Sequence, residues 1–206
     1  EMFADEFHGQ GGPLNVSKIR HENNPTKDFV EAGSKLYKHN EDFNGGEQEG
    51  IGFYQTTQKD GKRCSTAKAY LVPAIDRPNL TVITEANVNK ILIDNQKAAG
   101  VEYIDAEGES HNILASKEVL LCSGAFGSPQ ILLRSGIGSR EEIEKHGIEH
   151  KVDLPGVGKN LQDHIDYLTV HKYNSMQFIG TSIKAFLIKY PLEVLKYILK
   201  KTGLFT

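Results

Sequence analysis

The amino-acid sequence predicts a mixed α/β fold that carries a small antiparallel β-meander. Residues 80–115 contain short apolar or alternating runs separated by turn residues, which indicates strands that fold back on one another. Residues 119–122 are all apolar, as expected for a strand covered on both faces of a parallel sheet. Segments on both sides of this region space their apolar residues at the helical period. An α/β fold with some α+β character accounts for all three observations.

The meander is predicted from four short runs and the polar turns between them. These runs are residues 80–84, 88–93, 100–104 and 113–115. Asp94 and Asn95 supply one turn and Gly108 another, because Asn, Asp and Gly tolerate the backbone angles that tight turns require. We therefore expect neighbouring runs to pair as antiparallel strands.

Helices and one hairpin are expected outside the meander, from apolar spacing, capping residues and the position of proline. The predicted elements are a helix over 26–38, a strand over 53–57, a turn at 59–62, a helix from Ser65 to Leu71, a capped helix from Ser139 to Gly147, and a mostly helical tail over 183–199 interrupted at Pro191. They would flank the predicted sheet on both sides along the chain.

The junction after the apolar run 119–122 is the segment with the clearest chemical potential. Gly124 follows the run, Ser128 stands at a natural N-cap position, and Pro129 suits the first helical turn, so we expect a short helix over 130–135. A buried strand, a glycine and a helix N-terminus together place backbone N–H groups where a nucleotide could bind. Such junctions are more often purely structural, and no G-x-G-x-x-G or G-x-x-x-x-G-K-[ST] motif that would grip a diphosphate follows a strand here.

Composition excludes several classes of function. The 206 residues carry a net charge of −3 without a basic segment, which argues against a nucleic-acid partner. Two cysteines, Cys64 and Cys122, suggest neither a disulfide framework nor a zinc site, and they favour a reducing compartment. No run reaches the roughly 20 apolar residues that cross a bilayer. We expect a cytoplasmic protein, with peripheral attachment to the inner membrane as the alternative.

Residues 124–138, GAFGSPQILLRSGIG, resemble a known family signature over their whole length. They match, position for position, the second signature of the glucose–methanol–choline (GMC) oxidoreductases. Other similar segments follow in family order: His8-Gly9 to Gly12-Pro13-Leu14, Gly61-Lys62-Arg63 with Ala69-Tyr70-Leu71, Asn79 to Val82, Gly100 to Tyr103, and Val157 to His164. The resemblance therefore covers nearly the whole chain and indicates the middle third of such an enzyme.

This resemblance implies a Rossmann-type FAD-binding domain interleaved with part of a substrate domain. Residues 53–158 would belong to the FAD-binding domain. Residues 1–52 would be part of the substrate domain, and residues 159–206 would begin its second segment. FAD is the implied cofactor, and no metal is implied.

Four residues match positions that contact FAD in the family. Val88 matches a valine whose main chain contacts the adenine, although its side chain would also suit an ordinary β-sheet core. Ser123, Gly124 and Ala125 match the turn that lies against the adenosine half of FAD. A side chain at Gly124 would block the close approach of the backbone to the cofactor.

The resemblance assigns no catalytic residue to this chain. The catalytic histidine of the family is expected beyond Thr206, and the N-terminal glycine fingerprint before Glu1. His164 beside Asp163 could be interpreted as an oriented general base. In the family this run is a recurring structural motif, so we favour the structural interpretation.

Three functions are compared on this basis. The favoured one is a fragment of an FAD-dependent oxidoreductase that converts a primary alcohol to an aldehyde, similar to bacterial alcohol dehydrogenases that use a non-oxygen acceptor, with a choline dehydrogenase-type member as the alternative. The substrate would be a small alcohol, and a quinone as electron acceptor is implied only by this likeness. A non-catalytic truncated remnant is the alternative of another class. An NAD-dependent Rossmann enzyme is disfavoured, because its fingerprint is absent.

Overall fold

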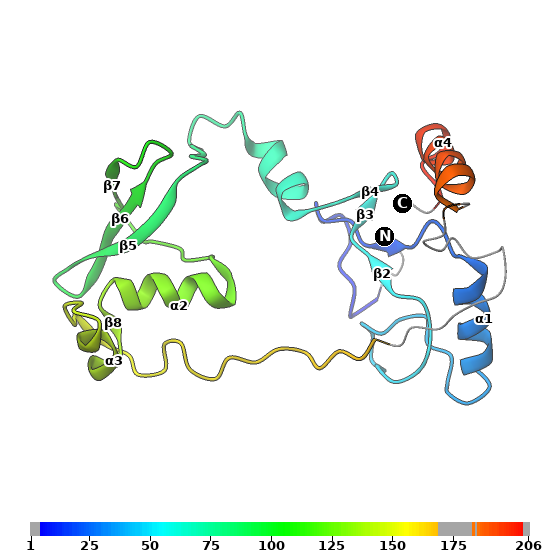
Figure 1. Cartoon of the computed structure of the whole chain (residues 1–206), viewed down its shortest axis with the longest axis horizontal. Helices are drawn as coiled ribbons and strands as arrows, with labels where there is room; N and C mark the ends of the chain where they lie inside the picture. Colours follow the sequence, from blue (N-terminus) through cyan, green and yellow to red (C-terminus); the bar gives the residue numbers. More distant parts are fainter. Residues whose placement is uncertain (1–4, 169–182, 184, 204–206) are drawn as a thin grey trace. The chain divides into compact units, whose positions relative to one another are not determined.

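The computed structural model describes residues 5–168, 183 and 185–203, and these fall into two units. The first unit contains the described residues up to Thr81 together with those from Ile183 onward, and the second is Val82–Leu168. Both contain helices and strands, as Figure 1 shows, which confirms the mixed fold class predicted from the sequence.

A three-stranded antiparallel sheet forms one layer of the second unit (Figure 1). It consists of β5 (Asn87–Asp94), β6 (Lys97–Ile104) and β7 (Ser110–Leu114), in the order β5-β6-β7. Asn95 and Gln96 close the first hairpin with φ angles of 47° and 62°. Two consecutive left-handed residues form the turn whose twist matches that of paired strands. The predicted meander is therefore confirmed, except that residues 80–84 form no strand.

Helix α2 (Gly124–Arg134) packs against β5 and leads into a small parallel pairing. There β8 (Ile137–Gly138) pairs with β9 (Val152–Asp153), and α3 (Arg140–Lys145) lies between them in sequence. The buried apolar side chains of this unit belong to Ile91, Ile131, Ile137, Ile143 and Val157. They come from the sheet, from both helices and from the loop after β9, so the unit has a core of its own.

The predicted buried strand over residues 119–122 is wrong. This segment has no regular structure, Cys122 is exposed, and the side chain of Leu120 is 77% exposed. A strand needs a neighbour to satisfy its backbone hydrogen bonds, and no strand among the described residues pairs with this segment. Apolar sequence alone could not supply that neighbour.

The helix after this segment begins earlier than the sequence predicted. It starts at Gly124 rather than near Ser128, so that Pro129 lies inside it. The Ser128 hydroxyl does not cap this helix; it accepts a hydrogen bond from the backbone N–H of Ser123 at 3.1 Å. Proline at this position removes one intrahelical hydrogen bond, a defect that lies close to the helix start.

In the first unit, α1 (Asn24–Gly33) is shorter than the helix predicted over 26–38. It begins at the Asn23 cap, whose side-chain oxygen accepts from the Thr26 N–H at 2.9 Å. It ends where the Ser34 hydroxyl donates to the Val30 carbonyl at 2.8 Å. The apolar spacing continues to Tyr37, but the residues after Gly33 form turns instead of regular helix.

Short strands make up the rest of the β-structure of this unit. β1 (Ser17–Lys18) pairs with β2 (Gln55–Thr56), and β3 (Gln58–Lys59) pairs with β4 (Lys62–Arg63). The turn predicted at 59–62 is confirmed, since Asp60 and Gly61 both adopt positive φ angles between β3 and β4. The strand predicted over 53–57 is reduced to its central residues in β2.

The remaining helical turns follow the predicted positions. Residues Ala67–Leu71 and Val72–Ala74 form consecutive π and 3₁₀ turns, and Ala185–Lys189 precedes α4 (Tyr190–Lys200). Pro191 stands in the first turn of α4, directly after the π turn Ala185–Lys189, so it lies where π geometry changes to α geometry within a continuous helical stretch. Within the described ranges, no helix combines the length and apolar character needed to cross a membrane.

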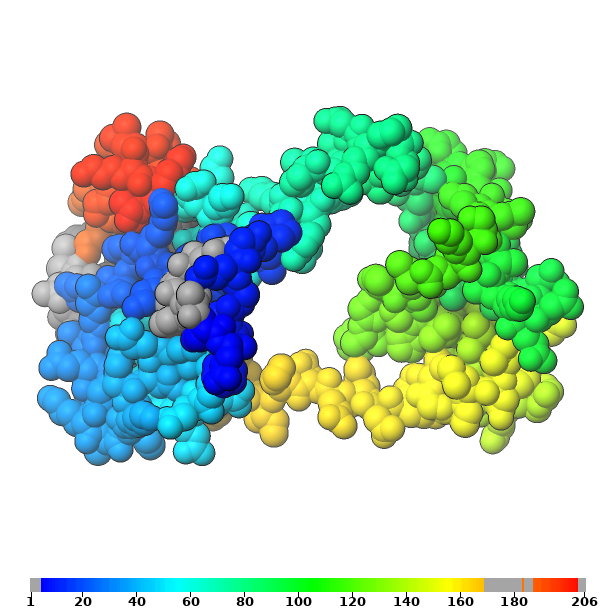
Figure 2. Space-filling model, turned by 180° about the vertical axis from the view of Figure 1, so that it is seen from behind, coloured from blue at the N-terminus to red at the C-terminus, as the bar shows by residue number. Residues whose placement is uncertain are grey.

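Residues 159–168 have no regular structure and run as an extended, exposed segment, shown from yellow to orange in Figures 1 and 2. Leu161, Ile165 and Tyr167 all expose their side chains there. Its first residues, 159–164, belong to the segment Val157 to His164, which resembles the family.

Candidate cofactor-contact site

Ser123, Gly124 and Ala125 lie at the N-terminus of α2 and are all exposed. Gly124 has a φ angle of +77°, in the left-handed region that residues other than glycine rarely adopt. A Cβ atom added to Gly124 would meet no atom within 4 Å. Backbone geometry therefore explains the glycine within the described chain, and the space in front of it is open to a ligand.

The beginning of α2 also presents hydrogen-bond donors and partial positive charge. The first N–H groups of a helix have no partner inside it, and the helix dipole adds to their field. Ser123 is different, because its N–H is already bonded to the Ser128 hydroxyl. This bond fixes the turn, and the residues that follow, Gly124, Ala125 and Phe126, are exposed. Such an arrangement suits an anion or a nucleotide.

Val88 lies in β5, half-buried, and pairs with Tyr103 of β6. The register of the two strands shifts between Val88 and Lys90, so the sheet is locally irregular beside this residue. The next residue, Asn89, accepts a hydrogen bond from the guanidinium of Arg134, at the end of α2. Val88 is thus placed near the C-terminal end of the helix whose N-terminus carries Gly124.

The structure does not bring the four predicted residues into one contact. A helix rises about 1.5 Å per residue, so Gly124 and Arg134 are separated by roughly 15 Å along α2. Different parts of an extended dinucleotide could contact the two places, but a single ring could not. An exposed positive-φ turn at Gly124 and a half-buried Val88 are the features that bear on the expected FAD contacts, and the buried strand predicted before the turn is absent.

Sequence reasoning missed a polar connection between α2 and β5. The Ser135 hydroxyl donates to the Ile131 carbonyl at 2.6 Å and accepts from the backbone N–H of Ile91 at 2.7 Å. Ser135 is only 3% exposed. Its place in the long signature, directly after the helix, was the one signal in the sequence that could have identified it.

A second part of this connection surrounds Glu102 on β6. Asn89 donates a hydrogen bond to the Glu102 carboxylate, and Lys90 pairs with it at 3.2 Å. These contacts hold the pKa of Glu102 below its usual range, first through Asn89 and then through Lys90, with Arg134 adding a smaller attraction. The Asn89 side chain therefore joins α2 to the middle strand of the sheet.

The pair Asp163–His164 does not form an oriented base in this structure. His164 is exposed, and Asp163 accepts a hydrogen bond from the backbone N–H of His164 at 2.8 Å. This is a local turn contact, which agrees with the structural interpretation. Among the described residues, no cluster of three or more His, Cys, Asp or Glu side chains could hold a metal ion.

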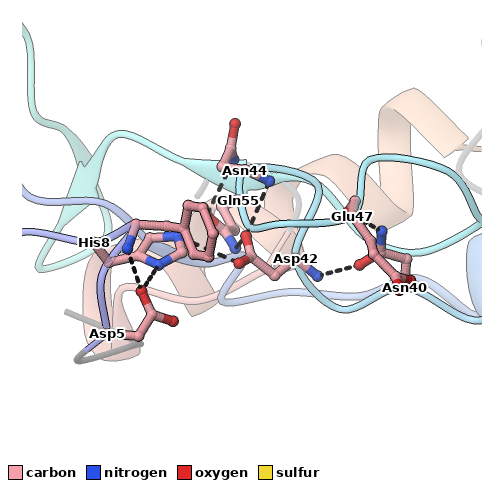
Figure 3. Close-up of polar contacts among 8 residues, drawn as sticks. Asp5, His8, Asn40, Asp42, Asn44, Glu47 and Gln55 are labelled. Carbon is pink, nitrogen blue, oxygen red and sulfur yellow. Dashed lines mark hydrogen bonds and ion pairs between the residues drawn. The ribbon is translucent and has the colours of Figure 1, made fainter.

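A separate polar cluster organises the N-terminal part of the first unit (Figure 3). His8 contacts Asp5 through Nδ1 at 2.6 Å and Asp42 through Nε2 at 3.4 Å. Asp42 also accepts hydrogen bonds from the Gln55 side chain and the Asn44 backbone. The hydrogen bond with Asp5 and the nearby carboxylate of Asp42 raise the pKa of His8.

Comparison with known proteins gives the family of this chain. Residues 2–166 match the family described as GMC oxidoreductase. The chain belongs to this family, which confirms the resemblance found in the sequence. Membership and a structural neighbour described as FAD-dependent support FAD as the cofactor.

Among characterised relatives, the chain is 44% identical to an alcohol dehydrogenase (acceptor) of Pseudomonas putida, over 97% of this chain and 36% of that protein. It is also 44% identical to the mitochondrial choline dehydrogenase of Homo sapiens, over 81% of this chain and 28% of that protein. The chain therefore spans about a third of the length of these relatives.

Solved structures agree with this fold. An FAD-dependent oxidoreductase from Chaetomium thermophilum superposes with a TM-score of 0.82 and 28% identity, over 96% of this chain and 35% of that one. Pyridoxine 4-oxidase from Mesorbium loti gives a TM-score of 0.67 and 33% identity, over 76% of this chain and 31% of that one. The fold class predicted from the sequence is confirmed.

Proposed function

We propose that this chain forms the part of an FAD-dependent alcohol dehydrogenase that contacts the adenosine half of the cofactor. The observation that carries the proposal is the 44% identity to the alcohol dehydrogenase (acceptor) of Pseudomonas putida over 97% of the chain. The exposed, positive-φ turn at Gly124 supports it, because backbone can approach a ligand closely there.

The residues of this chain bind and orient rather than react. The main chain of Val88 would contact the adenine, and the turn at Ser123, Gly124 and Ala125 would lie against the adenosine half of FAD. The dipole of α2 favours negative charge at that turn. When bound, FAD supplies the hydride acceptor for the oxidation. Residues 53–158 are assigned to the FAD-binding domain, and residues 1–52 and 159–206 to the substrate domain.

The reaction proposed for the whole protein is oxidation of a primary alcohol to an aldehyde. We assign no catalytic base to this chain, because its resemblance to the family carries no such residue within these positions. A non-oxygen electron acceptor such as a quinone is part of this proposal, and the name of the Pseudomonas putida relative, which specifies an acceptor, supports it.

Choline is the second candidate substrate. The chain is 43% identical to the oxygen-dependent choline dehydrogenase of Acinetobacter baumannii over 84% of its length, nearly the identity shared with the alcohol dehydrogenase. The greater coverage of this chain by the alcohol dehydrogenase favours the simple alcohol.

A chimaera tests the proposal. Residues 1–206 replace the matching third of the Pseudomonas putida relative, and flavin content and dye reduction are measured with primary alcohols and with choline. We expect a yellow protein that oxidises a primary alcohol more efficiently than choline, with the unmodified relative as control. A folded chimaera without flavin would overturn the cofactor role and favour the non-catalytic remnant. Preferential oxidation of choline would instead select the second candidate.

A further inference from the structure

We propose that Ser135 is a positioning residue that holds β5, and with it the main chain of Val88, in place for the adenosine half of FAD. This inference rests on the proposed function and adds a residue to it. Ser135 is 11 positions away from the predicted turn at Gly124 and contacts no predicted cofactor residue directly. It acts through Ile91.

The hydroxyl of Ser135 is the connecting group. It uses its single hydrogen to bond the Ile131 carbonyl at 2.6 Å, which fixes the rotamer of the side chain on α2. One lone pair then accepts the backbone N–H of Ile91 at 2.7 Å. A hydroxyl can donate and accept at once, so serine links helix and strand with one short side chain.

The bond reaches β5 at Ile91, between two irregularities in the pairing of β5 with β6. Among the described residues β5 is an edge strand, paired only with β6. Its register shifts once between Val88 and Lys90 and again between Leu92 and Ile93, so Ile91 lies between two irregularities. A bulge disrupts the ladder locally and leaves the neighbouring backbone less firmly held by its partner strand. A buried bond to α2 therefore helps to fix the backbone of β5 at Ile91.

Arg134 adds a second, exposed bond between α2 and β5. Its guanidinium donates to Asn89, the residue next to Val88, and Asn89 in turn donates to Glu102. Helix α2 thus holds β5 on both sides of Lys90, by a buried bond at Ile91 and an exposed bond at Asn89. Because α2 also carries Gly124, the helix sets the separation between the two cofactor contacts.

The first test uses the 206-residue chain and needs no cofactor. In Ser135→Ala, amide hydrogen exchange at Ile91 should accelerate at least tenfold, because the N–H loses a buried acceptor. Ile143→Val is the matched control, since it weakens the core of the same unit without touching this bond. Unchanged exchange at Ile91 in Ser135→Ala would overturn the connection itself, whatever the protein binds.

The second test uses the chimaera and separates the two halves of the cofactor. ADP reports on the adenosine half and FMN on the flavin half, with each affinity measured by calorimetry. We expect Ser135→Ala to weaken ADP and FAD about tenfold and to leave FMN unchanged, and Ser135→Thr, which keeps the hydroxyl, to recover most of this loss. Arg134→Met should lower the affinity for ADP about threefold. Because Arg134 bonds Asn89 at an exposed position, this variant leaves no buried polar group unpaired.

The outcomes distinguish positioning from general stability and from the proposed function. Equal loss of ADP and FMN affinity in Ser135→Ala, or the same ADP loss in Ile143→Val, would show a merely structural role. Failure of the unmutated chimaera to bind ADP or FAD would overturn the proposed function, and the positioning role with it, while the exchange result for Ile91 would stand.

Discussion

The side chain of Ser128 accepts a hydrogen bond from the backbone N–H of Ser123 across the start of α2. This bond closes the turn that carries Gly124, and the residues from Gly124 to Phe126 are exposed. The predicted cofactor turn is therefore shaped by a residue five positions along the chain, inside the family signature.

Ser128→Ala should loosen this turn. The exposed bond contributes about 1 kcal/mol or less to the free energy of unfolding, so we expect a small loss of stability. FAD affinity of the chimaera should fall severalfold, because Ser123 would no longer be fixed. Thermal unfolding and flavin titration measure the two effects. Ser116→Ala, at an exposed position in the same unit, is the control, and an equal drop in affinity there would contradict the role of Ser128.

Gly124→Val should lower the FAD content of the chimaera more than Val88→Ala does. Valine at a φ angle of +77° is strained by about 1 kcal/mol or more and obstructs backbone approach, whereas Val88→Ala keeps the main chain. Gly147→Val is a matched control, since Gly147 has a φ angle of +71° and an added Cβ would likewise meet nothing within 4 Å. The measurement is the flavin absorbance of purified protein. If Gly124→Val and Gly147→Val lost equal amounts of FAD, backbone strain alone would explain the effect, and the predicted cofactor contact at Gly124 would be contradicted.

The attachment of the N-terminal segment through His8 should depend on pH. The pKa of His8 is raised above 6.5, mainly by its hydrogen bond with Asp5, so this contribution to stability is complete below pH 6.5 and is lost as pH rises through the higher folded pKa. The pKa of Asp5 is lowered from 3.8 by the same contact, so its contribution is lost as pH falls through that lower value. Titration of His8 by NMR checks this. In Asp5→Asn, the pKa of His8 should move down, and no movement would contradict the assignment.

The 206-residue chain alone should bind FAD weakly and reduce no dye in the presence of alcohols, because the chain contains no G-x-G-x-x-G after a strand and no assigned base.

The 206-residue chain should also self-associate, since α4 exposes Leu195, Ile198 and Leu199. Sedimentation at increasing concentration measures this association, and Leu199→Lys should reduce it. A monomeric chain that retained flavin through dialysis and oxidised alcohol at the rate of the chimaera would refute this expectation.

Local signals in the sequence predicted the elements whose partners are close along the chain. Asn95 follows an alternating run and precedes another, and the hairpin between β5 and β6 forms there. Residues 119–122 were different, because an all-apolar run becomes a strand only beside another strand, and sequence spacing does not reveal one. The same limit hid Ser135, whose partner Ile91 is 44 positions away. The family match identified Ser123, Gly124 and Ala125, whereas the geometry of their turn required coordinates.

The bond from Ser135 to Ile91 also shields the β5 edge of the three-stranded sheet. An edge strand with free N–H groups can act as a template for a strand from another molecule, which begins edge-to-edge aggregation. In β5, the donor of Ile91 is already occupied by a buried hydroxyl, and α2 lies against that strand. An approaching strand would have to displace the helix before it could pair there, so the serine that joins helix to sheet also protects the β5 edge from pairing with another chain.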